Sequence, residues 1–294
     1  MRVLLIGARG MLGTDLRSVL ADRYELIAPD RQSVDITDEA AVRRCVEAAG
    51  PDVIVLAAAY TDVERAEDER ETAFLVNETG TRHVAVAAQS ADASLIYFST
   101  DFVFDGKKGT AYTESDEPNP VSVYGRSKLA GEKQAELAPR HCIIRTAWLY
   151  GPKKANFVEK MVSLAREHGR LSVTAEEMGS PTYTLDLAHA VDWALETGLT
   201  GLYHVTDAGW CSRYEFATEI VNLAGLENVV VEPAAPGEIA TKAARPTFGV
   251  LSNALWEEAG GPPMRHWTEA LRAYLHGRRD RWTVLQAEGP TREQ

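Results

Sequence analysis

Residues 1–20 read MRVLLIGARGMLGTDLRSVL, and this stretch decides how the rest of the chain folds. Its first part, Arg2–Ile6, is a short aliphatic run that predicts a buried strand. Its last part, Met11–Leu20, has apolar residues at helical spacing and predicts a helix. The glycine-rich residues between these two parts predict a sharp turn. The chain therefore opens as strand, turn and helix.

Three glycines, Gly7, Gly10 and Gly13, occupy this turn with the spacing G-x-x-G-x-x-G. Residues without a Cβ let the backbone bend tightly and approach a phosphate closely, and the N–H groups that begin the helix favour an anion. We therefore predict a dinucleotide site that includes Met11 and Leu12, with a purely structural turn as the alternative explanation. The glycine spacing differs from the G-x-G-x-x-G form of many dehydrogenases.

The rhythm of strand and helix continues along the first half of the chain. An alternation of this kind predicts βαβ crossovers and a parallel sheet that helices cover on both faces. We therefore predict an α/β fold with a doubly wound parallel sheet of the Rossmann type. The further predicted strands are Glu25–Ala28, Val53–Ala57, Leu95–Ser99 and Cys142–Thr146, and the predicted helices are Glu39–Ala49, Thr72–Ser90 and Tyr124–Leu137.

After Gly151 the pattern loosens, which indicates a smaller C-terminal substrate-binding lobe made of helices and loops. We assign residues 1–150, with about 183–208 and 239–251, to the dinucleotide-binding domain, and about 151–182, 209–238 and 252–294 to the lobe. The elements expected in this half are helices at Asn156–His168, Leu185–Thr197 and Arg213–Ala224, a strand at Gly201–Thr206, and an irregular tract at Glu232–Gly237.

The composition argues against several classes of function. A chain of 294 residues with 45% hydrophobic and 25% charged positions suits a globular enzyme. A net charge of −12, without a stripe of Lys and Arg, argues against nucleic-acid binding. The longest apolar stretches, such as Asp52–Tyr60, fall short of the ~20 residues that a membrane span requires, so we expect a cytoplasmic protein without a membrane partner.

The cysteines and histidines indicate neither a disulfide framework nor a metal centre. Cys45, Cys142 and Cys211 lie far apart in the chain and make an odd number. The seven histidines are scattered, and none of them shows the spacing that puts two ligands on one face of a helix. We therefore predict no metal-ligating residues.

Further residues extend the predicted dinucleotide site. Asp30 ends the second predicted strand, where an acid can accept a hydrogen bond from the adenosine ribose. Asp30 favours NADH, whereas the neighbouring Arg31 could pair with the 2′-phosphate of NADPH, so both cofactors stay open. Asp35 and Ile36 are expected beside the adenine. The small residues Ala57, Ala58 and Ala59 are expected to pass close to the cofactor, unless they only pack a strand end.

Tyr124 and Lys128 stand four residues apart, so a helix projects both side chains from the same face. A tyrosine has a pKa of about 10, and a nearby ammonium group favours its phenolate, which would ease proton release to a carbonyl oxygen. Lys128 could also hold the nicotinamide ribose. Thr100 follows a predicted strand at the edge where parallel sheets bind ligands, and its hydroxyl could stabilise the developing alkoxide. The alternative for Thr100 is a helix cap.

With these features the chain resembles the extended short-chain dehydrogenase/reductases, and among them the dTDP-4-dehydrorhamnose reductases. The resemblance spans roughly Met1 to Leu275. Its most specific parts are the motifs Ser99–Gly106, Pro118–Glu132 and Arg145–Gly151, and further matches are Gly179–Thr182, Asp186–Ala188, Gly201–His204, Tyr214–Ala217 and Arg245–Pro246.

The resemblance implies that Thr100, Tyr124 and Lys128 are the catalytic residues. It also implies that NADPH or NADH reduces the C4 ketone of a dTDP-4-keto-6-deoxy sugar, dTDP-4-dehydro-L-rhamnose, to dTDP-L-rhamnose. The residues expected to contact the substrate are Thr61, Val63, Thr100, Asp101, Phe102 and Trp148. Trp148 would offer a flat apolar wall to the sugar, with a core aromatic as the alternative explanation.

One position departs from the family pattern. Phe102 stands where the family usually has tyrosine, so a hydroxyl near the substrate is missing and the identity of the sugar stays open. One alternative is therefore a sister 4-ketoreductase that acts on another nucleotide-linked deoxysugar. Another is a non-catalytic regulator, because the regulatory subunit of methionine adenosyltransferase resembles this family. The resemblance also allows a homodimer held by magnesium and carboxylates, but we align no such acids and do not predict the ion.

Overall fold

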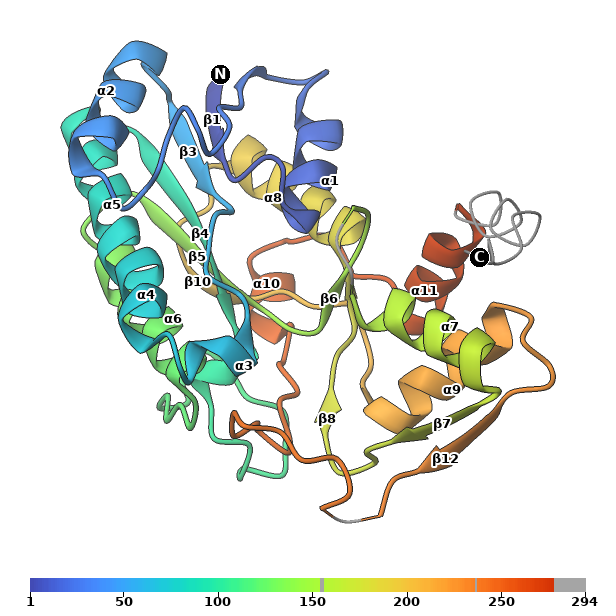
Figure 1. The fold of residues 1–294 in the computed structure, drawn as a ribbon. Coiled ribbons are helices and arrows are strands. Elements are labelled where there is room, and N and C mark those ends of the chain that lie inside the picture. The colour runs from blue at the N-terminus through green and yellow to red at the C-terminus, as the bar shows by residue number, and fades with distance from the viewer. Residues whose placement is uncertain (154–155, 236, 278–294) are drawn as a thin grey trace, which may run out of the picture.

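The computed structural model describes residues 1–153, 156–235 and 237–277, and a parallel sheet of six strands forms its centre (Figure 1). The strands follow the order β10-β5-β4-β3-β1-β2, and every neighbouring pair is parallel. The chain therefore reverses its direction of winding beside β1, and ligands of such sheets bind at that point. The strands are β1 (Arg2–Ile6), β2 (Glu25–Ile27), β3 (Val53–Leu56), β4 (Ser94–Thr100), β5 (His141–Thr146) and β10 (Gly201–His204).

Helices cover both faces of this sheet. On one face α1 (Met11–Leu20) and α8 (Thr184–Thr197) pack on side chains such as Val3 and Leu5, together with Trp256 of α10 (Ala254–Glu258). On the other face lie α2 (Glu39–Ala49), α5 (Thr81–Ser90) and α6 (Val123–Ala135). The strands are aliphatic on both sides because both sides are buried. The predicted doubly wound α/β fold is confirmed.

The predicted helix Thr72–Ser90 is interrupted in the structure. It consists of α4 (Arg70–Phe74), a π-helical turn η1 (Leu75–Gly80) and α5, and the short α3 (Val63–Ala66) precedes it. Within η1 the buried Asn77 accepts a hydrogen bond from the Tyr60 backbone at 2.8 Å and donates one to the Ser127 hydroxyl at 2.9 Å. The wider turn thus ties the segment after β3 to helix α6.

The C-terminal lobe contains strands that the sequence did not indicate. Strands β7 (Arg170–Val173) and β12 (Val230–Pro233) form a small parallel sheet against which α7 and α9 pack, and α11 packs in turn on α9. The expectation of helices and loops alone is therefore wrong here, because alternate residues such as Leu171 and Val173 turn toward the helices. The lobe helices are α7 (Phe157–His168), α9 (Arg213–Leu223) and α11 (Trp267–His276).

Two short ladders connect the lobe with the segments around it. Strand β6 (Leu149–Tyr150) pairs with β9 (Thr182–Tyr183), and β8 (Met178–Gly179) pairs with β11 (Cys211–Ser212). The part of the predicted lobe beyond residue 277 lies outside the described residues.

Helix α6 lies unusually close to β4, to η1 and to residues 101–103, which follow β4. A Cβ at Gly131 would lie 2.2 Å from the Tyr97 hydroxyl oxygen, and a Cβ at Gly125 would lie 2.1 Å from the Phe102 carbonyl oxygen. Beside Gly131, the buried Glu132 accepts two hydrogen bonds from the Arg145 guanidinium, at 2.9 and 2.7 Å. Close packing and a buried ion pair therefore fix how α6 sits on the sheet.

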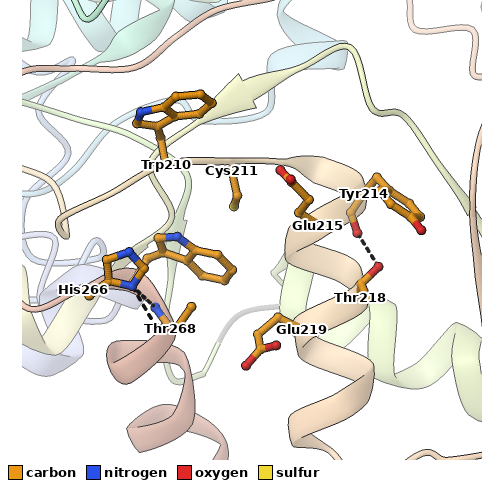
Figure 2. Close-up of a pocket in the computed structure, with 9 residues that line it drawn as sticks. Trp210, Cys211, Tyr214, Glu215, Thr218, Glu219, His266 and Thr268 are labelled. Carbon is orange, nitrogen blue, oxygen red and sulfur yellow. Dashed lines mark hydrogen bonds between the residues drawn. The ribbon is translucent and has the colours of Figure 1, made fainter.

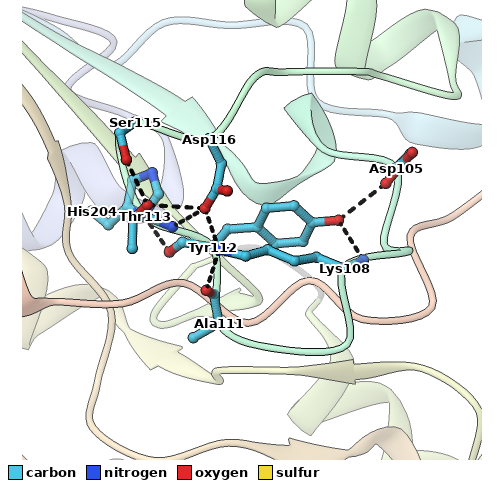
Figure 3. Close-up of polar contacts among 8 residues, drawn as sticks. All are labelled: Asp105, Lys108, Ala111, Tyr112, Thr113, Ser115, Asp116 and His204. Atoms are coloured by element: carbon cyan, nitrogen blue, oxygen red, sulfur yellow. Dashed lines mark hydrogen bonds and ion pairs between the residues drawn. The ribbon is translucent and has the colours of Figure 1, made fainter.

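A polar network organises the segment between β4 and α6 (Figure 3). After the short 3-10 helix η2 (Asp101–Val103), Tyr112 stacks on Phe104 with ring centroids 4.1 Å apart, and its hydroxyl donates to Asp105. The Tyr112 carbonyl oxygen lies 3.1 Å from Nδ1 of His204, which is fully buried at the end of β10. This long connection is thereby fastened to the sheet before it enters α6.

We expect His204 to make stability depend on pH. Burial lowers the pKa of His204 to about 3, and the positive charge of Arg145 lowers it further, so the folded chain keeps this ring neutral. An unfolded histidine titrates near pH 6.5, so unfolding takes up a proton as the pH falls from about 6.5 to about 3. Within that window His204 should cost about 1.4 kcal/mol of stability per pH unit.

The variant His204→Asn should lose this contribution, because an amide can donate to the Tyr112 carbonyl without titrating. Urea unfolding of both proteins between pH 4 and 7 measures the two slopes. Parallel slopes for the variant and the wild type would contradict the assignment.

Candidate functional site

One cleft of about 2450 Å³ runs along the carboxyl edge of the sheet and reaches the lobe. The ends of β1, β3, β4 and β5 meet there because all four strands are parallel. With one exception, every site residue predicted from the sequence lines this cleft. Those residues are Gly7, Gly10, Met11, Leu12, Asp30, Arg31, Asp35, Ile36, Ala57, Ala58, Ala59, Thr61, Val63, Thr100, Asp101, Phe102, Tyr124, Lys128 and Trp148.

The exception is Gly13, which does not belong to the lining. A Cβ at Gly13 would lie 2.1 Å from the Gly7 carbonyl oxygen, so this glycine lets α1 pack on the turn. Gly7 has a φ of +96°, and a Cβ there would lie 2.5 Å from the Ala58 backbone nitrogen. Because Gly7 and Gly13 have no side chain, the backbone segments around them can pack closely against each other.

Helix α1 begins at Met11, and in the described structure no side chain caps its N-terminus. Gly10 precedes the helix and lines the cleft. The first N–H groups of a helix attract anions, both by hydrogen bonding and through the helix dipole. This end of the cleft can therefore hold a pyrophosphate.

Asp30 and Asp35 mark the far end of the same half of the cleft. Asp30 accepts hydrogen bonds from the Ser33 backbone at 2.9 Å and from the Ser33 hydroxyl at 2.8 Å, which lower its pKa, and Arg9 lies 3.1 Å away. Asp35 is held in the same way by the backbone and the hydroxyl of Thr37. Both carboxylates are thus fixed, and Arg9 joins Arg31 as a cation at this rim.

Thr100, Asp101 and Tyr124 form the centre of the cleft. The Thr100 hydroxyl donates to Oδ1 of Asp101 at 2.9 Å and accepts from the Phe102 backbone at 3.2 Å. Loss of solvation raises the pKa of the partly buried Tyr124, Asp101 raises it further, and a hydrogen bond with Thr100 acts to lower it. The Phe102 ring meets the Tyr124 ring edge-on, with centroids 5.5 Å apart. Tyr124 therefore remains a protonated phenol.

Lys128 has different partners from those that we expected. Its Nζ donates to the Tyr97 hydroxyl at 2.7 Å and to the Phe98 carbonyl at 2.6 Å. Burial lowers the pKa of Lys128 to about 7, and Glu132 acts in the opposite direction. The expected acidification of Tyr124 by Lys128 is wrong for this structure, because desolvation of the phenol dominates.

The lobe side of the cleft is built around Trp148. Its backbone is left-handed, with a φ of +47°, and a Cβ at Gly179 would lie only 2.4 Å from the indole ring. The guanidinium carbon of Arg213 lies 3.4 Å from the centroid of that ring, and Arg213 Nε lies 3.4 Å from a Glu177 oxygen. Arg213 is largely buried, which lowers its pKa to about 10. Trp148 thus presents a wall that a cation supports from one side.

Sequence reasoning missed several residues of this cleft. Arg213 and Glu177 come from the lobe, and no motif spacing links them to Tyr124. Glu64 of α3 accepts a hydrogen bond from Arg245 at 2.6 Å, and both residues line the cleft. Only Arg245 could have been found, because it belongs to one of the motifs that carried the family resemblance.

A second hollow, of about 420 Å³, lies in the lobe between α9 and α11 (Figure 2). Trp210 and His266 line it, and two of its polar groups already have partners within the lobe. The His266 ring lies 2.8 Å from the Thr268 hydroxyl, and Glu215 accepts from Ser212 at the start of α9. None of the predicted site residues reaches this hollow. The large cleft is therefore the candidate active site.

Two negative findings concern the described part of the chain. None of its helices is both long enough and apolar enough to span a membrane. Among those same residues, no three or more His, Cys, Asp or Glu side chains converge as metal ligands would.

Comparisons with known proteins agree with this fold and cleft. A dTDP-4-dehydrorhamnose reductase of Mycolicibacterium smegmatis is 41% identical over 276 residues, which cover 92% of this chain and 84% of that protein. A dTDP-4-keto-6-deoxy-D-glucose reductase of Streptomyces niveus is 40% identical over 92% of this chain and 95% of its own. The crystal structure of a dTDP-4-dehydrorhamnose reductase from Bacillus anthracis in complex with NADP superposes with a TM-score of 0.91, at 38% identity, over 94% of this chain and 99% of that one.

The sequence also matches a protein family over residues 1–279, which is nearly its whole length. The resemblance predicted from the motifs is thereby confirmed. This chain belongs to the RmlD substrate binding domain family.

Proposed function

We propose that this chain reduces the C4 ketone of dTDP-4-dehydro-L-rhamnose, with NADPH or NADH as the reductant. The observation that carries the proposal is the contact between Thr100 and Tyr124 at the middle of a cleft that begins at the glycine turn. The names of the relatives from Mycolicibacterium smegmatis and Bacillus anthracis support the reaction and the cofactor. Both expected reactants are charged nucleotides that do not cross membranes unaided, so we propose a cytoplasmic location.

The residues present suit a nicotinamide dinucleotide. The start of α1 would hold its pyrophosphate, Asp30 and Arg31 its adenosine ribose, and Lys128 its second ribose. When bound, the cofactor supplies a hydride to the ketone carbon. We assign the sheet and its helices, residues 1–150 with about 183–208 and 239–251, to this task, and the lobe to the sugar nucleotide.

The protein side chains act on the ketone oxygen. Tyr124 gives its phenolic proton to that oxygen, and Thr100 donates a hydrogen bond to the charge that develops there. The raised pKa of Tyr124 keeps the proton on the phenol until the oxygen becomes basic. Trp148, backed by Arg213, offers its ring to the sugar and limits the access of water.

A second candidate is reduction of an epimeric keto sugar. Phe102 packs on Tyr124 without offering a hydroxyl, and one relative is named for dTDP-4-keto-6-deoxy-D-glucose. Turnover on the two epimeric dTDP-sugars, followed by the absorbance of NADPH, separates the candidates. If the protein oxidises no NADPH with either of the two sugars, both candidate functions are overturned and a regulatory protein is favoured.

Tyr124→Phe should lower kcat by roughly 10²- to 10⁴-fold, the range typical of a general acid, because the ketone oxygen loses its proton donor. The affinity for NADPH should stay near that of the wild type, since the ring and its packing on Phe102 remain. Steady-state rates and fluorescence titration measure the two quantities. Tyr203→Phe is a matched control, because among the described residues its hydroxyl bonds the Thr200 carbonyl alone, at the sheet edge. Full activity of Tyr124→Phe would refute the role.

Replacing both Arg9 and Arg31 with alanine should weaken NADPH binding by about tenfold or more and leave NADH binding nearly unchanged. The reason is that a hydrogen bond to a charged phosphate contributes about 1.5–3 kcal/mol, and only NADPH carries the 2′-phosphate. Asp30→Ala is the converse control, because it should weaken NADH more than NADPH. Calorimetric titration of each variant with both cofactors measures the effect, and equal losses for the two cofactors would contradict it.

A further inference from the structure

Asp101 is a buried carboxyl group in which one oxygen is hydrogen-bonded and the other has no hydrogen-bond partner among the described residues. Its side chain is 2% exposed, and its Oδ1 accepts the Thr100 hydroxyl proton at 2.9 Å. Among the described residues, Oδ2 has no hydrogen-bond partner, although it is buried in the wall of the cleft. A buried ionised carboxylate with an unpaired oxygen is costly, so this geometry favours the neutral acid.

The groups around Asp101 come from several elements. Arg213 of α9 attracts the carboxylate, whereas Glu177 opposes its charge, and the Asp101 charge in turn disfavours ionisation of Tyr124. The chain passes close to Oδ2 at Gly249, where a Cβ would lie 2.8 Å away. Burial outweighs the attraction of Arg213 and raises the pKa of Asp101 to about 6. A proton can therefore be stored at Asp101 near neutral pH and also be released.

The protonation of Asp101 decides which way the Thr100 hydroxyl points. The 2.9 Å contact between Thr100 Oγ1 and Asp101 Oδ1 serves both states, and with Asp101 ionised Thr100 is the donor. With Asp101 protonated, the acid can donate to Thr100 Oγ1, and the Thr100 proton is free to turn toward Tyr124. Thr100 is the residue that contacts both groups. The order of contacts is thus Asp101, Thr100, Tyr124.

We propose that Asp101 stores the proton that recharges Tyr124 through Thr100, so that these three side chains form a proton relay. The inference rests on the proposed function. After the Tyr124 O–H bond has broken and its proton has gone to the ketone oxygen, the phenolate takes the Thr100 hydroxyl proton. Thr100 Oγ1 then takes the proton of Asp101, which becomes a carboxylate and regains a proton from water once the product has left. No oxidant or reductant is consumed in these transfers.

Lys128 does not occupy this position in the relay. Its Nζ donates to the Tyr97 hydroxyl and the Phe98 carbonyl, and neither Thr100 nor Asp101 is among its hydrogen-bond partners in the described structure. Asp101 acts through Thr100 and contacts no reacting atom, so it is a positioning and relay residue. A residue that only supported the fold would lower the rates of the first and the later turnovers equally. A relay residue would lower only the later ones, so comparing the two rates separates the two roles.

The test compares the first turnover with later turnovers in Asp101→Asn. Its amide can donate to Thr100 as the acid does, but it has no proton to release. Rapid mixing of the enzyme and NADPH with the keto sugar measures both rates through NADPH absorbance. We expect the ratio of the first-turnover rate to the steady-state rate to rise by about 10²-fold over wild type, the lower end of the range for acid–base groups.

Asp207→Asn is the matched control, because Asp207 is also buried with an unpartnered oxygen but does not line the cleft. Its ratio should equal that of the wild type. If both rates of Asp101→Asn fall together, or if neither falls, the relay is wrong. If wild-type enzyme oxidises no NADPH with either sugar, the proposed function itself fails, so the two failures are distinguishable.

The pH profile supplies a second readout. Since the relay needs protonated Asp101, wild-type steady-state turnover should be high at pH below about 6 and fall as the pH rises above it. Asp101→Asn should lack this decline, because its amide does not titrate. A decline that persists in the variant would assign it to another group and overturn the relay.

Discussion

The site depends on how closely helix α6 approaches the π-helical turn and the short helix η2 that follows strand β4. The approach is possible only because two positions on the helix have no side chain. A Cβ at Gly131 would lie 2.3 Å from the Asn77 carbonyl oxygen, and one at Gly125 would overlap the Phe102 carbonyl. Tyr124 stands directly before one of these glycines and Lys128 lies between them, so the spacing that permits contact with the sheet also positions the reactive side chains. The Glu132–Arg145 pair then holds the helix in place.

Burial, rather than the pairing of charges, controls the chemistry at the centre of the cleft. Tyr124, Lys128 and Asp101 all have pKa values displaced toward their neutral forms, and in each case desolvation is the largest cause. A neutral phenol and a neutral acid are proton donors, which is what a developing alkoxide requires. In a site from which water is largely excluded, hydrogen bonds from these donors to the developing alkoxide are stronger than they would be in water.

The fold could be predicted well where the sequence pattern is local. Arg2–Ile6 and Met11–Leu20 begin and end as predicted, because an aliphatic run, a glycine turn and a helical repeat follow one another directly. The interruption of the predicted helix Thr72–Ser90 could not be foreseen, since it depends on Asn77 bonding Tyr60 and Ser127. The same holds for β7 and β12, two short strands far apart in the chain that become strands only by pairing with each other.

The candidate site, like the fold, includes residues that the sequence pattern predicts and residues that it does not. The residues at the ends of β1, β3 and β4 could be predicted because parallel strands bring their carboxyl ends to one edge, whatever the connections are. Arg213 and Glu177 arrive from the lobe, and their places depend on tertiary packing around Trp148 that no local pattern encodes. Their effect is nevertheless central: Arg213 supports the indole from one side and attracts Asp101. The lobe therefore adjusts the acidity of groups that the sheet positions, and a change of lobe sequence can alter the chemistry without touching the motif that carries it.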